Sequence, residues 1–202
     1  MKLPALPAKA GQKLTLGQLT GSSLSLMAAR LTQEAHRPVL LVTADTPSAL
    51  RLEQELQYLL ADTGSPVLLF PDWETLPYDT FSPHQDIISQ RLETLYKLPQ
   101  MSSGVLIVPI STLMLRTAPR VYLDKYSLMV KSGQRLNLQQ LRARLAEAGY
   151  VAVEQVLEHG EFAARGSLLD LFPMGSSSPY RIDFFDDEVD SIRPFDPETQ
   201  RS

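Results

Sequence analysis

The sequence predicts an α/β chain in which a small parallel sheet with helices is followed by a small α+β domain with antiparallel strands. Three short and almost continuous apolar runs alternate with helix-like segments in the first half, which is the pattern of βαβ units. After about residue 124, several strand-like segments follow one another with one amphipathic helix among them. We therefore expect a first domain over residues 1–122 and a second over 123–202.

The first domain alternates helix and strand. Helices are expected at residues 22–35, 46–63 and 82–98, strands at 38–45, 66–71 and 104–110, and a further short helix capped by Ser111. The strand segments, such as PVLLVTAD and GVLIVPI, are typical of strands buried on both faces of a sheet. Right-handed crossovers between such strands give a parallel sheet. Three strands make a small sheet, so we expect its remaining strands to lie beyond residue 202.

The second domain has a different pattern. Its helix is expected at residues 138–149, with Leu138, Leu141 and Leu145 on one stripe and Gly149 at its end. Strands are expected at residues 127–133, 150–156, 164–173, 179–185 and 189–195. The sequences MGSSSP and FDDE read as turns between strands, so these strands are expected to pair antiparallel.

Composition narrows the classes of function. The 202 residues are 44% apolar and 21% charged, as in ordinary globular proteins, and the formal net charge is −4. Direct DNA binding is disfavoured, because it calls for a basic surface. The chain has no cysteine, which rules out disulfides, thiolate metal sites and a cysteine nucleophile. Its apolar runs are too short to span a bilayer and its N-terminus is unlike a signal peptide, so we expect a cytoplasmic protein with no membrane partner.

A loop near the N-terminus has the position of a phosphate loop without its chemistry. Residues 16–31 read LGQLTGSSLSLMAARL, a Gly-containing turn that runs into a helix-like stretch. When residues 18–25 are aligned with the phosphate-loop motif G-x-x-x-x-G-K-[ST], its four signature positions are occupied by Gln18, Ser23, Leu24 and Ser25. Gly21 lies inside the loop. Both signature glycines and the lysine are lost, and these groups cradle the phosphates and neutralise their charge. We expect no ATP binding and no cofactor; nucleotide binding by an altered loop stays the alternative.

Two further groups of polar residues could suggest chemistry. The loop FPDWETLPYDTFSPHQD gathers potential metal ligands, namely Asp72, Glu74, Asp79, His84 and Asp86. No recognised ligand spacing is present, so the sequence favours caps and turns over a metal site. His159 is near Ser167 and Asp170 but lacks a nucleophile elbow, which favours a loop histidine over a catalytic base. No acidic motif for Mg²⁺ follows an apolar strand, so no ATPase activity is expected of this chain.

Three long stretches carry a resemblance to a known family. DWETLPYDTFSPHQDIISQRLETLYKL (72–98), EHGEFAARGSLLDLFPMG (158–175) and YRIDFFDDEVDSIRPFD (180–196) resemble the N-terminal region of the bacterial transcription-repair coupling factors (Mfd). This region is similar to the first domains of the excision-repair helicase UvrB, which carries a related R-G-x-h-h-D-h-F-P strand and F-D-x-E turn. The resemblance implies an incomplete RecA-like domain over residues 1–122 and a UvrA-binding domain over 123–202.

The resemblance also implies partners. UvrA is the partner implied for this chain, whereas RNA polymerase and double-stranded DNA would be bound by domains of the family that lie outside it, as would the ATP-dependent motor. In UvrB the N-terminal loop is a true phosphate loop. The loop of this chain departs from that pattern at Gln18, Ser23 and Leu24, which implies a fold that is kept as a scaffold after ATPase activity was lost.

The resemblance and strand alternation together suggest a UvrA-binding site at Arg165, Arg181 and Phe185. In YRIDFF, alternation places Arg181 and Phe185 on one face and the core residues on the other. An exposed aromatic beside an arginine is a pairing enriched at interface hot spots. The alternative is that Phe185 packs under the following turn while Arg181 only pairs with Asp183. Arg165 is expected to reach the surface only if Gly166 forms a bulge.

Overall fold

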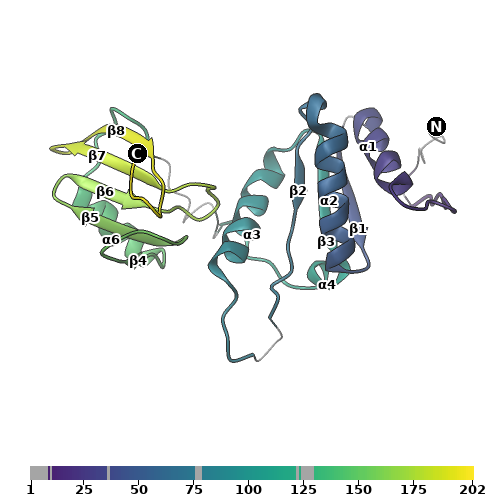
Figure 1. Ribbon diagram of the computed structural model, residues 1–202, viewed down its shortest axis with the longest axis horizontal. Helices are drawn as coiled ribbons and strands as arrows, with labels where there is room; N and C mark the ends of the chain where they lie inside the picture. Colours follow the sequence, from purple (N-terminus) through teal and green to yellow (C-terminus); the bar gives the residue numbers. More distant parts are fainter. Residues whose placement is uncertain (1–8, 10, 36, 76–78, 122, 124–129) are drawn as a thin grey trace. The chain divides into compact units, whose positions relative to one another are not determined.

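The computed structural model describes residues 9, 11–35, 37–75, 79–121, 123 and 130–202 (Figure 1). The chain divides into two compact units, Met1–Asp72 with Lys97–Arg116, and Trp73–Tyr96 with Thr117–Ser202. The segment Trp73–Tyr96 thus groups with the second unit, although its sequence pattern predicts it in the first domain. The boundary at residue 122 stays a prediction. No helix within the described ranges is long and apolar enough to cross a membrane.

The first unit is a three-stranded parallel sheet with helices. Its strands, in the order β1-β3-β2, are β1 (Pro38–Thr43), β3 (Gly104–Pro109) and β2 (Val67–Leu69). Its helices are α1 (Ser23–Ala35), α2 (Thr46–Leu60) and α4 (Ile110–Leu113), with 3-10 turns at Ala61–Thr63 and Leu98–Gln100. This confirms the predicted alternation and the parallel sheet.

Helix α2 shows how local sequence sets the packing of this unit. The Asp45 carboxylate accepts a hydrogen bond from the Ser48 N–H at 2.8 Å, and proline follows at the start of the helix. The apolar residues that recur along α2 then pack with α1 on one face of the sheet (Figure 1). The buried core of this unit is Ala28, Ala29, Ala49, Leu52, Leu56, Leu60, Val105 and Ile107.

Two expectations for the first unit are wrong. The strand at 38–45 is not buried on both faces, because Leu40 and Val42 are 53% and 47% exposed. They point away from the face that α1 and α2 cover. Ser111 does not cap α4, which begins at Ile110; its hydroxyl donates to the Asp72 carboxylate instead, at 2.6 Å.

The second unit holds a five-stranded sheet in the order β4-β5-β6-β7-β8. Its elements are α3 (Gln85–Lys97, up to Tyr96), α6 (Leu138–Glu147), β4 (Val151–Ala152), β5 (Glu161–Arg165), β6 (Leu168–Leu171), β7 (Tyr180–Phe185) and β8 (Glu188–Pro194). Neighbouring strands are antiparallel, as predicted, except that β4 runs parallel to β5. The expected strand at 164–173 is two strands joined by a turn, and that at 150–156 is reduced to two residues. The strand expected at 127–133 lies largely outside the described residues.

Helix α6 covers one face of this sheet. The Asn137 side chain accepts hydrogen bonds from two N–H groups in the first turn and so caps the helix. Gly149, at φ +90°, ends it as predicted. Leu141 and Leu145 are buried against the strands, and the core is completed by Phe162, Leu169, Leu171, Ile182, Phe184 and Val189.

Candidate protein-binding face and degenerate phosphate loop

The loop at residues 18–25 leads into α1 without a strand before it in the described residues. Gln18 and Gly21 both have positive φ angles, of 60° and 55°. Ser23 begins the helix, and its hydroxyl donates to the Thr20 carbonyl at 2.6 Å. Leu24 stands at the position of the missing lysine and is 39% exposed. The loop therefore forms a turn and a helix start, as the sequence favours.

A carboxylate from α2 occupies the neighbourhood of this turn. The hydroxyl of Ser25, which is 1% exposed, donates to the Glu55 carboxylate, and the Ser22 hydroxyl lies 3.3 Å from the other Glu55 oxygen. In a working phosphate loop, the hydroxyl at the position of Ser25 binds the Mg²⁺ that accompanies the nucleotide. Here that hydroxyl is engaged, and the negative charge beside it repels a phosphate.

Two of the candidate metal ligands lie close together, since His84 Nδ1 is 3.4 Å from the Asp86 carboxylate. Asp72 accepts from Ser111, and Asp79 accepts from the N–H of Thr80 at 2.9 Å. The described part of the chain holds no group of three or more histidine and acidic side chains placed to share a metal ion. The contact of Asp79 lies within its own loop, whereas that of Asp72 is made with a residue of α4, 39 positions later in the chain.

His159 joins three segments of the second unit and is not placed beside a nucleophile. Its Nδ1 lies 2.8 Å from the Asp86 carboxylate on α3, and its Nε2 lies 2.8 Å from the carbonyl of Ser176. Its ring also packs on Phe172, with 4.0 Å between centroids. The Asp170 carboxylate faces Arg181 instead, so the structure does not assemble His159, Ser167 and Asp170 into a catalytic group.

The face of the second sheet that is opposite to α6 is rich in charged side chains. We call it the polar face, and its members by register are Val151, Glu161, Ala163, Arg165, Leu168, Asp170, Arg181, Asp183, Phe185, Glu188, Ser191 and Arg193. Strand register defines it, since Ala163, Asp170, Arg181 and Arg193 are direct cross-strand neighbours along β5, β6, β7 and β8. The three residues suggested for UvrA binding therefore share one face, which sequence spacing alone did not settle.

Phe185 and the residues beside it follow the predicted alternation. Ile182 and Phe184 are 2% and 5% exposed in the core, whereas Phe185 is 76% exposed. The alternative in which Phe185 packs under the turn is wrong. A bulge between β7 and β8 at Asp183/Phe184 leaves the alternation within β7 intact.

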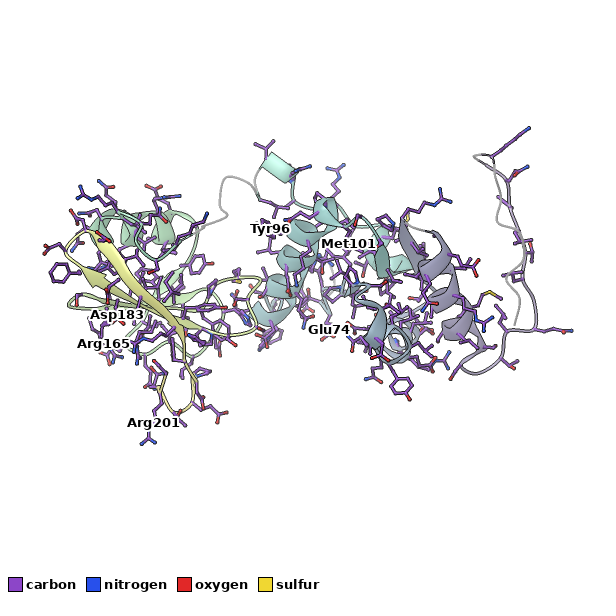
Figure 2. All side chains as sticks on the ribbon, turned by 90° about the horizontal axis from the view of Figure 1, so that it is seen from above. Glu74, Tyr96, Met101, Arg165, Asp183 and Arg201 are labelled. Carbon is purple, nitrogen blue, oxygen red and sulfur yellow. The ribbon has the colours of Figure 1, made fainter. Side chains whose placement is uncertain are left out.

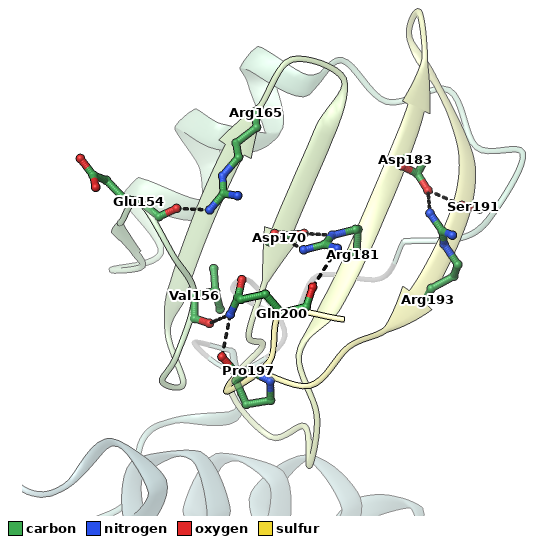
Figure 3. Close-up of polar contacts among 10 residues, drawn as sticks. All are labelled: Glu154, Val156, Arg165, Asp170, Arg181, Asp183, Ser191, Arg193, Pro197 and Gln200. Atoms are coloured by element: carbon green, nitrogen blue, oxygen red, sulfur yellow. Dashed lines mark hydrogen bonds and ion pairs between the residues drawn. The ribbon is translucent and has the colours of Figure 1, made fainter. Parts of the chain in front are cut away.

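Arg165 reaches the surface for a different reason from the one expected. Gly166, at φ +61°, and Ser167 form the turn between β5 and β6, so Arg165 ends a strand and pairs with Leu168. No bulge is needed, because the turn resets the alternation. Figure 2 labels the Arg165 side chain on the second unit, and its exposed guanidinium donates to the carbonyl of Glu154 (Figure 3).

Arg181 is held by its own domain. Its Nε and Nη2 donate to the two carboxylate oxygens of Asp170, at 2.7 and 2.9 Å, and its Nη1 donates to the Gln200 carbonyl at 3.3 Å (Figure 3). The hydrogen bond to Asp170 raises the pKa of Arg181, against a smaller desolvation effect. The alternative in which Arg181 only pairs with Asp183 is wrong, since its hydrogen-bonded partner is Asp170.

Asp183 and Arg193 form a second ion pair on the polar face. Asp183 accepts from the Ser191 hydroxyl at 2.7 Å and from the Arg193 guanidinium (Figure 3). The Ser191 hydrogen bond is the largest effect on the Asp183 carboxyl and holds its pKa below the usual value, with the arginines adding to this. Arg193 was not singled out by the sequence; its register opposite Arg181 places it here.

Comparisons with known proteins find relatives of the segment that contains the polar face. Residues 128–202 match the family model of the UvrB interaction domain. The chain is 54% identical over 197 residues to the transcription-repair-coupling factor of Escherichia coli (strain K12), and 50% identical over 199 residues to that of Haemophilus influenzae (strain ATCC 51907 / DSM 11121 / KW20 / Rd). Each match covers 98% of this chain and 17% of the relative. The protein of Bacillus subtilis (strain 168) is 33% identical over 188 residues, or 93% of this chain and 16% of that protein.

The resemblance found in the sequence is thus confirmed. This chain spans about a sixth of the length of the curated relatives it matches. It is similar along nearly its whole length to one region of the transcription-repair-coupling factors, and that region includes a UvrB interaction domain.

Proposed function

We propose that this chain recruits the nucleotide-excision-repair protein UvrA to sites of stalled RNA polymerase by protein–protein contacts, without ATPase activity of its own. The observation that carries the proposal is the placement of Arg165, Arg181 and Phe185 on one sheet face, within the segment that matches the UvrB interaction domain. Contacts with RNA polymerase and double-stranded DNA would belong to regions of the longer relatives that this chain does not cover.

The chemistry of the polar face suits a protein partner. Phe185 offers an exposed aromatic ring, and aromatic residues and arginine are enriched at the centres of protein interfaces. Arginine donors on this face favour an acidic or carboxylate-bearing patch on the partner. Arg181 has five N–H donors, of which three are already used, so its contribution is through the remaining two.

Binding of UvrA to variants of this chain tests the proposal. Changing Arg165, Arg181 and Phe185 together to Ala is expected to abolish capture of UvrA, at a cost of about 2 kcal/mol or more for each true hot spot. The matched control changes Arg142, Arg144 and Tyr58 to Ala. This control removes the same kinds of side chain, two arginines and one aromatic residue, from exposed positions outside the polar face.

The measurement is biolayer interferometry with immobilised UvrA, and circular dichroism checks that each variant is folded. The proposal predicts that the control binds as the unmodified chain does. If the folded site variant is retained by UvrA as strongly as the unmodified chain, the site assignment is wrong. If the unmodified chain itself does not bind UvrA, the recruiting function is wrong.

A further inference from the structure

Asp170 is a buried carboxylate on the polar face, and its cross-strand neighbour Ala163 is also buried, in a cluster with Val156, Phe172 and Phe195. Asp170 lies on β6, directly opposite Arg181 on β7, and only 4% of its surface is exposed. Both of its oxygens accept hydrogen bonds from the same guanidinium. A buried carboxylate is costly to desolvate, and this bidentate pair offsets that cost.

The pair fixes the Arg181 side chain before any partner arrives. The Arg181 side chain is 19% exposed, and its guanidinium also donates to the Gln200 carbonyl and lies 5.0 Å from the centroid of the Phe195 ring. The segment after β8 therefore helps to hold it, and Gln200 is itself held through hydrogen bonds from its side-chain amide to Val156 and Pro197. An arginine on an open surface samples many rotamers, whereas these contacts restrict the rotamers of Arg181.

We propose that Asp170 is a positioning residue for Arg181 at the UvrA-binding face, an inference that rests on the proposed function. Asp170 holds the guanidinium, with its two remaining N–H groups, in one orientation. Binding then does not have to order a long side chain, which is a cost that association otherwise carries. Arg181 acts through directed hydrogen bonds rather than as a free positive charge, because its charge is already compensated.

The proposal predicts a change in affinity for UvrA that is opposite in direction to the change expected from simple charge attraction. Asp170→Asn makes the polar face more positive by one unit. If Arg181 served only as a positive charge for an acidic partner, this change would strengthen binding. If Asp170 positions Arg181, the same change weakens binding, because Asn offers one acceptor oxygen and an NH₂ group that faces the arginine donors.

Glu147→Gln is the matched control. It changes the charge by the same amount, and Glu147 is an exposed residue of α6, which covers the side of the sheet opposite to the polar face. We expect the dissociation constant for UvrA to rise about tenfold or more in Asp170→Asn and to change by less than about threefold in Glu147→Gln. In an Arg181→Ala background, adding Asp170→Asn is expected to cause no further loss, because the residue that it positions is gone.

The outcomes separate this inference from the proposed function. An unchanged or tighter dissociation constant in folded Asp170→Asn overturns the positioning role, as does an equal loss in Glu147→Gln or a full additional loss in the Arg181→Ala background. If Arg181→Ala binds UvrA normally, the site assignment fails instead.

Arg181→Lys keeps the test decisive if Asp170→Asn does not fold. Lysine retains the charge but cannot engage both oxygens of Asp170 in a fork. Loss of UvrA binding in this folded variant is expected, and binding equal to that of the unmodified chain overturns the proposal.

Discussion

Leu141 is the residue of α6 on which the packing of the second sheet depends most directly. It is fully buried and contacts a core contributed by β5, β6, β7 and β8. Truncating it to Ala removes buried apolar contacts and leaves a cavity that rigid neighbours only partly fill. For a completely buried leucine, this costs about 2–5 kcal/mol of unfolding free energy. A domain of this kind has about 5–15 kcal/mol in total, so Leu141→Ala removes a large part of it.

Hydrogen exchange followed by mass spectrometry measures this effect within the intact chain. A loss of about 2–5 kcal/mol raises the opening equilibrium, and hence exchange of the best-protected amides, by a factor of about 30 to several thousand. This increase is expected in β5, β6 and β7 but not in β3, which belongs to the first unit and serves as an internal reference. Leu141→Asp is expected to unfold the domain, because it places a charge in the core without a partner.

Arg142→Ala is the matched control, since Arg142 neighbours Leu141 on the same helix but is exposed. Its effect on exchange is expected to correspond to within about 0.5 kcal/mol of zero. Unchanged exchange of β5, β6 and β7 in Leu141→Ala would refute the assignment of Leu141 to this core.

Two further expectations concern binding of nucleotide and dependence on pH. Neither the unmodified chain nor Leu24→Lys is expected to bind a fluorescent ATP analogue tightly, because Glu55 engages the Ser25 hydroxyl; saturable binding by anisotropy would contradict this. The Asp183 pKa is lower in the folded state than its ordinary value of 3.8, so its contribution to stability is present above pH 3.8 and is lost as pH falls through the folded value. In Asp183→Asn, the free energy of unfolding is therefore expected to fall less steeply as the pH is lowered than in the unmodified chain. An unchanged pH dependence in urea titrations would count against the pair with Ser191 and Arg193.

Local sequence determined much of the architecture. Apolar runs, prolines at helix starts and terminal glycines located α1, α2, α6 and the three parallel strands, since these signals act within a few residues. The alternation in YRIDFF also determined which side chains of β7 are buried, because side chains in a strand have a period of two. The family resemblance rested on long contiguous stretches and needed no structure.

Tertiary structure alone decided how the polar face is assembled. The sequence placed Arg165 with the core residues, but the turn at Gly166 and Ser167 reset the alternation and brought it to the surface. Local spacing suggested Asp183 as the partner of Arg181, two residues away on the same strand. The observed partner is Asp170 on the neighbouring strand, because cross-strand register places their side chains directly opposite each other. Such pairings depend on turn geometry and register between segments, which the pattern of one segment does not encode.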